Sequence, residues 1–409
     1  MRLSFHYGWA IVAAGTLTVF AAIGLGRFAL GMLLPSMGQG LDLSYAEMGF
    51  LGTANFLGYL GAVMVAGHVA QRFGARAVVG AGLFLVAGTM ILMGAAGGFA
   101  AALLLYAATG VGSGFANVPI MGLVSHWFGR GLRGKAAGLM IVGNGLAIVT
   151  AGQLVPWING WGGAAGWRWG WAVLGAIALL AAAAVAATVR NDPGDLDLEP
   201  LGGETGAPAP AAGPAGTAPR KAVLHLGAIY FLFGATYSVY VTFIVTTLVK
   251  EQGFPEDTAG AFWAWVGFLS LFSGPVFGTL SDRTSRRTGL IAAFLIQALA
   301  YGLASGGLPG AAVLLSVSLF GFTAFAVPTI MAAAVGDTLG PARAAKAFGL
   351  VTVFFGAGQV AGPAVAGLLA EASGSFAVAY GAAAAAVLSA ALLALFLKPA
   401  ERDRCASSS

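Results

Sequence analysis

The chain has 409 residues, of which 58% are hydrophobic and only 9% are charged. A soluble domain carries roughly 25% charged residues because its surface faces water. So few charges leave most of the surface apolar, which is stable only where lipid covers it. The composition therefore excludes a chain of ordinary soluble domains and predicts a polytopic membrane protein.

Cysteine and histidine are too few and too scattered for a disulfide framework or a metal site. The single Cys405 lies in a polar tail, and the four histidines form no pair at metal-ligand spacing. We therefore expect no metal, no cofactor and no enzyme activity. The net charge of +5 reflects basic residues placed between the spans, so no nucleic-acid partner is expected.

Long apolar stretches recur along the whole chain. A hydrocarbon core about 30 Å thick is crossed by about 20 apolar residues in a helix. Twelve such stretches lie at 8–36, 45–69, 77–98, 99–125, 135–156, 166–189, 222–249, 258–280, 288–307, 309–335, 347–370 and 374–397. We predict an all-α membrane protein, a monomer, with 12 transmembrane helices in two six-helix halves.

Lysine and arginine are unevenly distributed over the loops between these stretches. With a cytoplasmic N-terminus, seventeen of them face the cytoplasm and only Arg168 and Lys250 face outward. Cytoplasmic loops carry such an excess of basic residues. We therefore predict a multi-pass protein of a bacterial inner membrane, with both termini in the cytoplasm.

A polar segment separates the first six spans from the last six. Between residues 192 and 221 the chain is rich in proline, glycine and alanine and lacks the apolar bulk of a core. From the N-terminus, the predicted parts are a six-helix bundle at 1–190, a flexible cytoplasmic linker at 191–221, a second bundle at 222–398 and a cytoplasmic tail at 399–409.

The two sets of six spans repeat each other in sequence. Three matches occur in the same order in both halves: 67–76 with 278–287, 135–139 with 346–350, and 118–119 with 327–328. Because six spans separate the copies, the halves are parallel repeats, related by an axis along the membrane normal.

These repeats resemble the major facilitator superfamily over nearly the whole chain. The loop signature of that family, G-x-x-x-D-R-x-G-R-R, is nearly complete at 278–287, which contains Asp282 and Arg283. The first half keeps Arg72, but Gln71 replaces the aspartate. The resemblance implies that Arg72, Asp282 and Arg283 help to lock the cytoplasmic side in one state, with one member missing in the first half.

A narrower resemblance is to the monocarboxylate and oxalate–formate transporter branch. It rests on Tyr7-Gly8-Trp9 at the start of the first span and on 126–139, HWFGRGLRGKAAGL, before the fifth. Animal monocarboxylate transporters carry an Asp/Arg pair in the eighth span, whereas 258–280 has no charge here. The resemblance implies carboxylate transport, but it does not carry over that proton-coupling chemistry.

Arg27 lies deep inside the first predicted span, about 7–8 Å from its centre by helical rise. A guanidinium at this depth is costly unless it faces water, an acid or a ligand. The alternatives are a snorkelling arginine, which would have to pass ten residues to Met37, and a structural ion pair. We predict that Arg27 binds an anionic substrate, and that Gly24 and Gly26 let the ligand or a neighbouring helix approach.

Uncharged polar residues near mid-depth complete the predicted substrate site: Asn55, Asn117, Asn144, Tyr237, Tyr240 and Gln359. Each has an alternative role in hydrogen bonding between helices or in packing. In the family fold, spans one, four, seven and ten line the cavity, which favours Asn117 and the two tyrosines.

Proline and tryptophan mark other features of the spans. Pro119 and Pro328 are predicted kinks in spans four and ten, and bending there would serve gating. A predicted aromatic belt at the outer ends of spans five and six consists of Trp157, Trp161, Trp167, Trp169 and Trp171.

Together these features predict a secondary active transporter of small organic anions, in particular monocarboxylates such as lactate or pyruvate. Substrate would bind near mid-depth between the halves, with its carboxylate paired to Arg27. The coupling is either proton symport or anion exchange. Three alternatives stay open: a transporter of another small-molecule class, a non-transporting membrane sensor of the same fold, and a membrane-embedded enzyme, for which no catalytic cluster is found.

Overall fold

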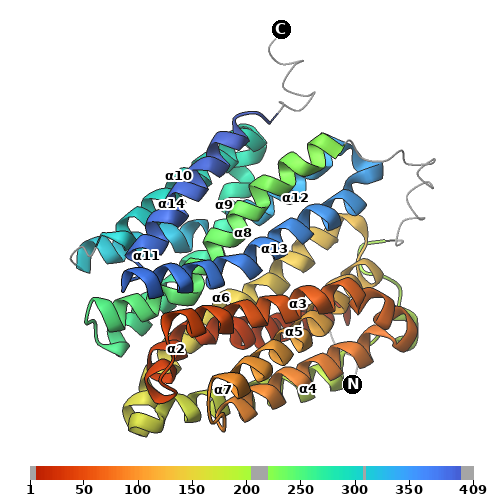
Figure 1. Cartoon of the computed structure of the whole chain (residues 1–409). Helices are drawn as coiled ribbons and strands as arrows, with labels where there is room; N and C mark the ends of the chain where they lie inside the picture. The colour runs from red at the N-terminus through yellow and green to blue at the C-terminus, as the bar shows by residue number, and fades with distance from the viewer. Residues whose placement is uncertain (1–5, 204–219, 307–309, 398–409) are drawn as a thin grey trace. The chain divides into compact units, whose positions relative to one another are not determined.

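The computed structural model describes residues 6–203, 220–306 and 310–397, and these form helices almost throughout (Figure 1). The elements in chain order are α1 (Gly8–Val19), η1 (Phe20–Phe28), α2 (Ala29–Gly40), α3 (Tyr45–Phe73), α4 (Ala75–Met93), α5 (Phe99–Trp127), α6 (Arg130–Gly162), η2 (Gly163–Ala165), α7 (Gly166–Thr188), η3 (Pro193–Leu196), α8 (Arg220–Thr246), η4 (Thr247–Glu251), α9 (Glu256–Arg283), α10 (Arg286–Ser305), α11 (Gly310–Thr323), α12 (Ala326–Leu339), α13 (Pro341–Ser373) and α14 (Ala377–Ala394).

Eleven helical stretches in the described residues are long and apolar enough to cross a membrane. The longest, Arg130–Thr188, has 59 residues and contains both α6 and α7, which the short turn η2 separates. Gly163 in this turn has a φ of +55°, a conformation that favours glycine and reverses the chain. With α6 and α7 counted separately there are twelve spans, and the predicted all-α membrane fold is confirmed.

The chain divides into two compact units, which are described separately. The first consists of Met1–Leu43 and Ala54–Ala211, and the second of Ser44–Thr53 and Ala212–Ser409. One boundary therefore falls inside α3, a division that the composition of the sequence did not indicate.

Within each unit, glycines allow two long helices to pack closely. In the first unit α6 runs along α1 and η1, and a Cβ added to Gly24 would lie 2.2 Å from the Cβ of Ala147. In the second unit α8 runs along α13, and a Cβ added to Gly358 would lie 2.1 Å from the carbonyl oxygen of Phe231. Small residues at such contacts let backbones approach, which is how membrane helices gain packing energy. Gly24 therefore serves helix packing.

The two predicted proline kinks differ. Span four is the unbroken helix α5, with Pro119 inside it. Span ten is divided into α11 and α12, and the Phe325 N–H between them donates to Ser273 Oγ at 3.0 Å. Pro328 lies in the first turn of α12, where its missing N–H leaves no helical bond unmade.

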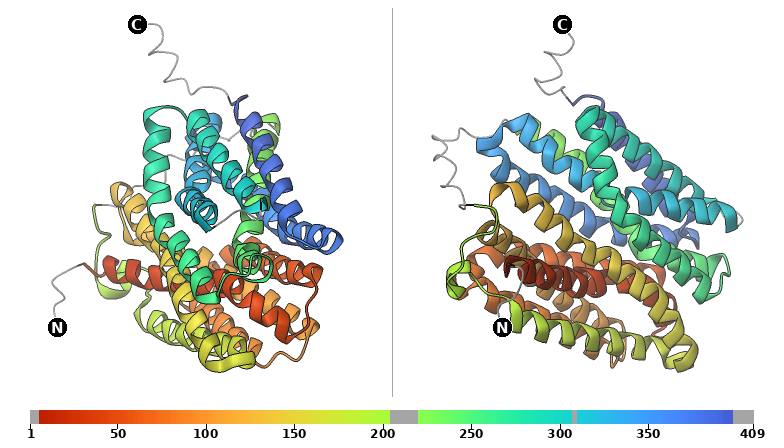
Figure 2. Two further views of the ribbon diagram at one scale, coloured as in Figure 1. Left: turned by 90° about the vertical axis from the view of Figure 1, so that its left-hand side faces the viewer. Right: turned by 180° about the vertical axis from the view of Figure 1, so that it is seen from behind.

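The start of the predicted flexible linker is folded onto the first unit (Figure 2). Asp192 forms a capping box at η3, and its side chain accepts a hydrogen bond from the Gly194 N–H. Further along, Leu201 pairs with the end of α5: its N–H donates to Trp127 O, and its carbonyl accepts from the Gly129 N–H. Local hydrogen bonds therefore order a stretch that is poor in apolar bulk. The rest of the predicted linker, 204–219, and the predicted tail lie outside the described residues.

The predicted aromatic belt is correct for only part of its members. Trp157, Trp161 and Trp169 are exposed, whereas Trp167 and Trp171 are buried. The spacing of four residues between the buried pair places both on the inner face of α7. Aromatic residues at a span end therefore include core residues as well as lipid-facing ones.

The Gly24 contact predicts a compensating pair of substitutions. Gly24→Ala places a methyl group on top of Ala147, and such overpacking costs about 1–3 kcal/mol of stability. Ala147→Gly in the same chain removes the clash, so the double variant should unfold at a higher temperature than Gly24→Ala. Thermal unfolding of the detergent-purified protein measures this. The matched control is Gly61→Ala, because a Cβ at Gly61 meets nothing within 4 Å.

Candidate functional site

Arg27 occupies the π-helical part of the first span. The span runs from Gly8 to Gly40 over 33 residues, so its centre is Gly24, and Arg27 lies about 4–5 Å further along the axis. The side chain is only 9% exposed. A π-helical turn widens the helix and occurs frequently at functional sites. The structure thus holds a guanidinium closer to the middle of the span than its position in the sequence indicated.

Two aromatic rings of α3 lie against the Arg27 guanidinium. Its Cζ is 4.7 Å from the centroid of the Phe56 ring and 4.4 Å from that of Tyr59. Such cation–π contacts contribute about 2 kcal/mol or more when they are desolvated. Phe56 and Tyr59 are three residues apart and therefore share one face of α3. The rings hold the charge in place.

Asn117 supports this arrangement through Tyr59. Its side-chain Nδ2 donates to the Tyr59 hydroxyl at 3.0 Å. Asn117 was predicted as a site residue, and it lies next to the ring that contacts Arg27. Sequence reasoning missed Tyr59. The available signal was its spacing of four residues from Asn55, which places both side chains on the same side of span two.

Asn55 fixes the backbone around Arg27. Its Nδ2 donates to the Tyr106 carbonyl at 3.2 Å and to the Gly26 carbonyl at 3.5 Å. The Tyr106 hydroxyl in turn donates to the Arg27 carbonyl at 2.9 Å. These side chains tie the Gly26 and Arg27 carbonyls of the first span to α3 and α5. Asn55 is thus placed to position Arg27.

Asn144 lies on α6, which packs against η1. Its side chain is buried, and its Oδ1 accepts no hydrogen bond from the described residues. The adjacent Gly143 contacts Thr16 and Phe20, so Asn144 lies level with the beginning of η1. Burying an amide oxygen without a hydrogen bond costs free energy of folding. A buried amide of this kind is typical of a position where the group meets water or a ligand.

The other predicted substrate residues belong to the second unit. Tyr240 is fully buried, its ring stacks on Phe320 at 3.9 Å, and its hydroxyl is 2.8 Å from Ser316 Oγ. Tyr237 also stacks on Phe320, at 5.8 Å. Gln359 is buried on α13. The ring and the hydroxyl of Tyr240 are thus both engaged in packing within the unit.

The loop between α9 and α10 is held by Arg286 instead of Arg283. The Arg286 guanidinium pairs with Asp282, pairs with Asp337 of α12 at 2.7 Å, and donates to Ser281 Oγ at 3.0 Å. Arg283 is exposed. Sequence reasoning missed Asp337, because the pair joins positions 51 residues apart. A network of several ion pairs stabilises a structure more than a single exposed pair does.

The corresponding loop of the first unit is built differently. Gly74 has a φ of +83°, whereas Ser285 at the equivalent position is extended and caps α10. The acid position is Gln71, and Arg76 uses its backbone N–H to bind Asn191 Oδ1 at 2.8 Å. The first loop is therefore tied to the folded segment after α7, and Arg72 beside it is exposed.

The comparison with protein families decides the class of this fold. A model described as "Uncharacterised MFS-type transporter YbfB" matches residues 19–395. The chain belongs to this family of major facilitator superfamily (MFS) transporters. It is therefore an MFS secondary transporter and a multi-pass membrane protein, and not an enzyme.

Two relatives and one solved structure show how far the likeness to other MFS transporters extends. The "Probable sulfoacetate transporter SauU" of Cupriavidus necator is 24% identical over 91% of this chain and 90% of its own. The hexuronate transporter of Bacillus subtilis is 23% identical over 87% of this chain and 86% of its own. A D-xylose–proton symporter structure, 17% identical, covers 97% of this chain and 99% of its own with a TM-score of 0.73, which shows the shared fold.

The bond between Asn117 and Tyr59 predicts that the two side chains are energetically coupled. Tyr59→Phe keeps the ring beside Arg27 and removes the hydroxyl, and Asn117→Leu removes the donor. Each single variant should lose about 0.5–1.5 kcal/mol of stability. Because both remove the same bond, the double variant should lose less than the sum. Thermal unfolding of the four proteins measures the coupling, and strictly additive losses would contradict it.

Proposed function

We propose that this MFS transporter carries small organic anions, in particular monocarboxylates such as lactate or pyruvate. The observation that carries the proposal is the buried guanidinium of Arg27 near the middle of the first span. An ionisable side chain at this depth is rare and is retained where it serves a substrate or ion pathway. The planar guanidinium matches a carboxylate through two parallel hydrogen bonds.

The substrates named for the two relatives support an anion. Sulfoacetate and hexuronate are both organic acids that carry a carboxylate, and both relatives align with most of the chain. Phe56 and Tyr59 present an aromatic surface beside Arg27, which suits a small acid with an apolar end. We infer that Asn117 and Asn144 contribute further polar contacts. Tyr237, Tyr240 and Gln359 stay predicted substrate residues.

Transport would proceed by alternating access, in which Arg27 is exposed to each side of the membrane in turn. Exchange of one anion for another needs only the Arg27 guanidinium as the partner of the substrate. A proton symporter would need a titratable group that loads together with the substrate. Uptake with and without a pH gradient distinguishes the two. Gating is assigned to Arg72, Asp282 and Arg283 and to bending at Pro119 and Pro328.

The distribution of basic residues supports a bacterial inner membrane with both termini in the cytoplasm. The prediction is tested with single cysteines in a Cys405→Ser background. Thr205→Cys and Ser407→Cys should react with a membrane-impermeant thiol reagent only in inside-out vesicles. Ala164→Cys, in the turn between α6 and α7, should react only in whole cells. Reaction of Thr205→Cys in whole cells would overturn the orientation.

Arg27 substitutions test the anion site. Arg27→Lys keeps the charge but loses the two-pronged geometry, so affinity for lactate or pyruvate should fall. Arg27→Ala should weaken binding about ten- to a hundredfold or more, as expected for loss of a charge-assisted hydrogen bond of roughly 1.5–3 kcal/mol. A ligand-induced thermal shift on the purified protein measures affinity, and uptake into proteoliposomes measures transport.

Two controls separate binding from folding. Lactamide has the shape of lactate without its charge, so it should give no shift with the wild type. Arg130→Ala removes an exposed basic residue at the start of α6 and should leave lactate binding unchanged. A folded Arg27→Ala protein that binds lactate as tightly as the wild type would contradict the proposal.

A further inference from the structure

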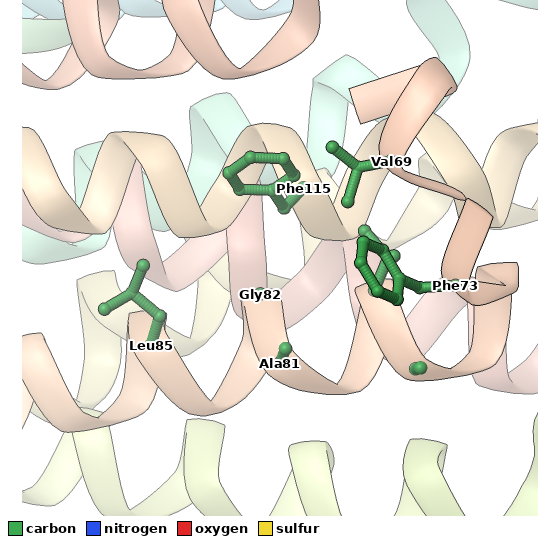
Figure 3. A pocket seen from close by; sticks show the side chains of 8 residues that line it. Val69, Phe73, Ala81, Gly82, Leu85 and Phe115 are labelled. Atoms are coloured by element: carbon green, nitrogen blue, oxygen red, sulfur yellow. The ribbon is translucent and has the colours of Figure 1, made fainter. Parts of the chain in front are cut away.

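An apolar cavity opens on the first unit beside the turn that joins α3 to α4. Its volume is about 370 Å³, and its lining comes from three helices: Val69 and Phe73 of α3, Ala77, Val78, Ala81, Gly82 and Leu85 of α4, and Phe115 of α5. Every side chain drawn around it in Figure 3 is hydrocarbon. The cavity therefore offers no polar group to a water-soluble substrate.

The walls and the floor of this cavity have different exposure. Phe73 is 63% exposed and Leu85 is 39% exposed, so both walls face the surroundings of the helices. The floor is buried at Gly82, where an added Cβ would lie 2.7 Å from the Ala116 nitrogen of α5. Gly82 therefore lets the backbones of α4 and α5 pack closely at the floor of the cavity. Because these helices cross a membrane, the medium that meets the hollow is lipid.

A basic side chain lies at the end of the cavity nearest the turn. The Arg72 guanidinium stands over the ring of Phe73, with its Cζ 5.4 Å from the ring centroid, so it is directly beside a residue of the wall. Arg72 is exposed, whereas the Nε of the nearby Arg76 donates to the Ala186 carbonyl of α7 at 3.1 Å. In the second unit the equivalent loop contains Asp282, which pairs with Arg286, whereas the first has Gln71 at that position. The first loop therefore keeps its positive charge, whereas in the second loop Asp282 partly neutralises the arginines.

We propose that the cavity binds one acyl chain of an anionic phospholipid, whose phosphate is held by Arg72. The cavity matches such a lipid, because a hydrocarbon slot along α4 ends beside a cationic side chain. A basic residue near a surface favours anionic lipid by about 1 kcal/mol, so the preference over a zwitterionic lipid of equal chains should be about fivefold. The occupant differs from the transported anion because the slot itself is lined by hydrocarbon, which suits an acyl chain.

The test uses native mass spectrometry of the purified chain with dioleoylphosphatidylglycerol and dioleoylphosphatidylcholine, which share their acyl chains. The wild type should retain one phosphatidylglycerol more tightly than phosphatidylcholine. Ala81→Phe fills the slot from its wall and should release both lipids. Its matched control is Ala183→Phe, which adds the same ring to an exposed alanine of α7 outside the cavity and should leave binding unchanged. Arg72→Gln should abolish the preference while keeping the chain bound.

A second measurement is independent of how the variants fold. Phosphatidylglycerol with a photoactivatable group in its acyl chain is added to the wild type, and crosslinked peptides are mapped. Adducts within 69–85 or at Phe115 support the proposal. Adducts only elsewhere overturn it, as does equal retention of phosphatidylglycerol by the wild type and Ala81→Phe. A wild type that binds both lipids equally would reduce the site to non-selective lipid packing and would contradict the assignment to Arg72.

Discussion

The first unit is organised around the need to keep one guanidinium charged at membrane depth. Arg27 is held by ring contacts from α3, and its backbone is fixed by Asn55 and Tyr106. Close packing of α6 on the other side depends on Gly24. A charge in hydrocarbon costs more free energy than any one of these contacts provides. Several contacts around the π-helical segment therefore act together to hold the guanidinium.

The two halves share a repeat but not its details, and the differences fall in the loop after the second span of each half and in spans four and ten. The second loop uses Asp282 and Asp337 to hold Arg286, whereas the first uses the folded segment that begins at Asn191. Span ten is interrupted before Pro328, while span four is continuous through Pro119. A repeated sequence thus produces similar helices whose ends are held by different side chains.

The surface of the first unit carries a second candidate binding site. The cavity at Gly82 and the exposed Arg72 face lipid, whereas Arg27 is enclosed by helices. Both places combine apolar walls with an arginine, but depth separates their ligands. In the two proposals, the buried Arg27 pairs with a small acid that enters through water, and Arg72 pairs with a lipid headgroup whose chains remain in the bilayer.

The sequence by itself determined the features that depend on position along the chain. Hydropathy located the twelve spans, the repeats showed two related halves, and counting from the span ends placed Arg27 deep in the first. The sequence did not show which side chains contact each other between helices. Tyr59, Tyr106 and Asp337 emerged only from the tertiary structure, as did the burial of Trp167. The reason is physical: a span in lipid is apolar on all its faces, so hydropathy does not reveal which face meets another helix. Only packing decides that, and packing places the rings beside the charge.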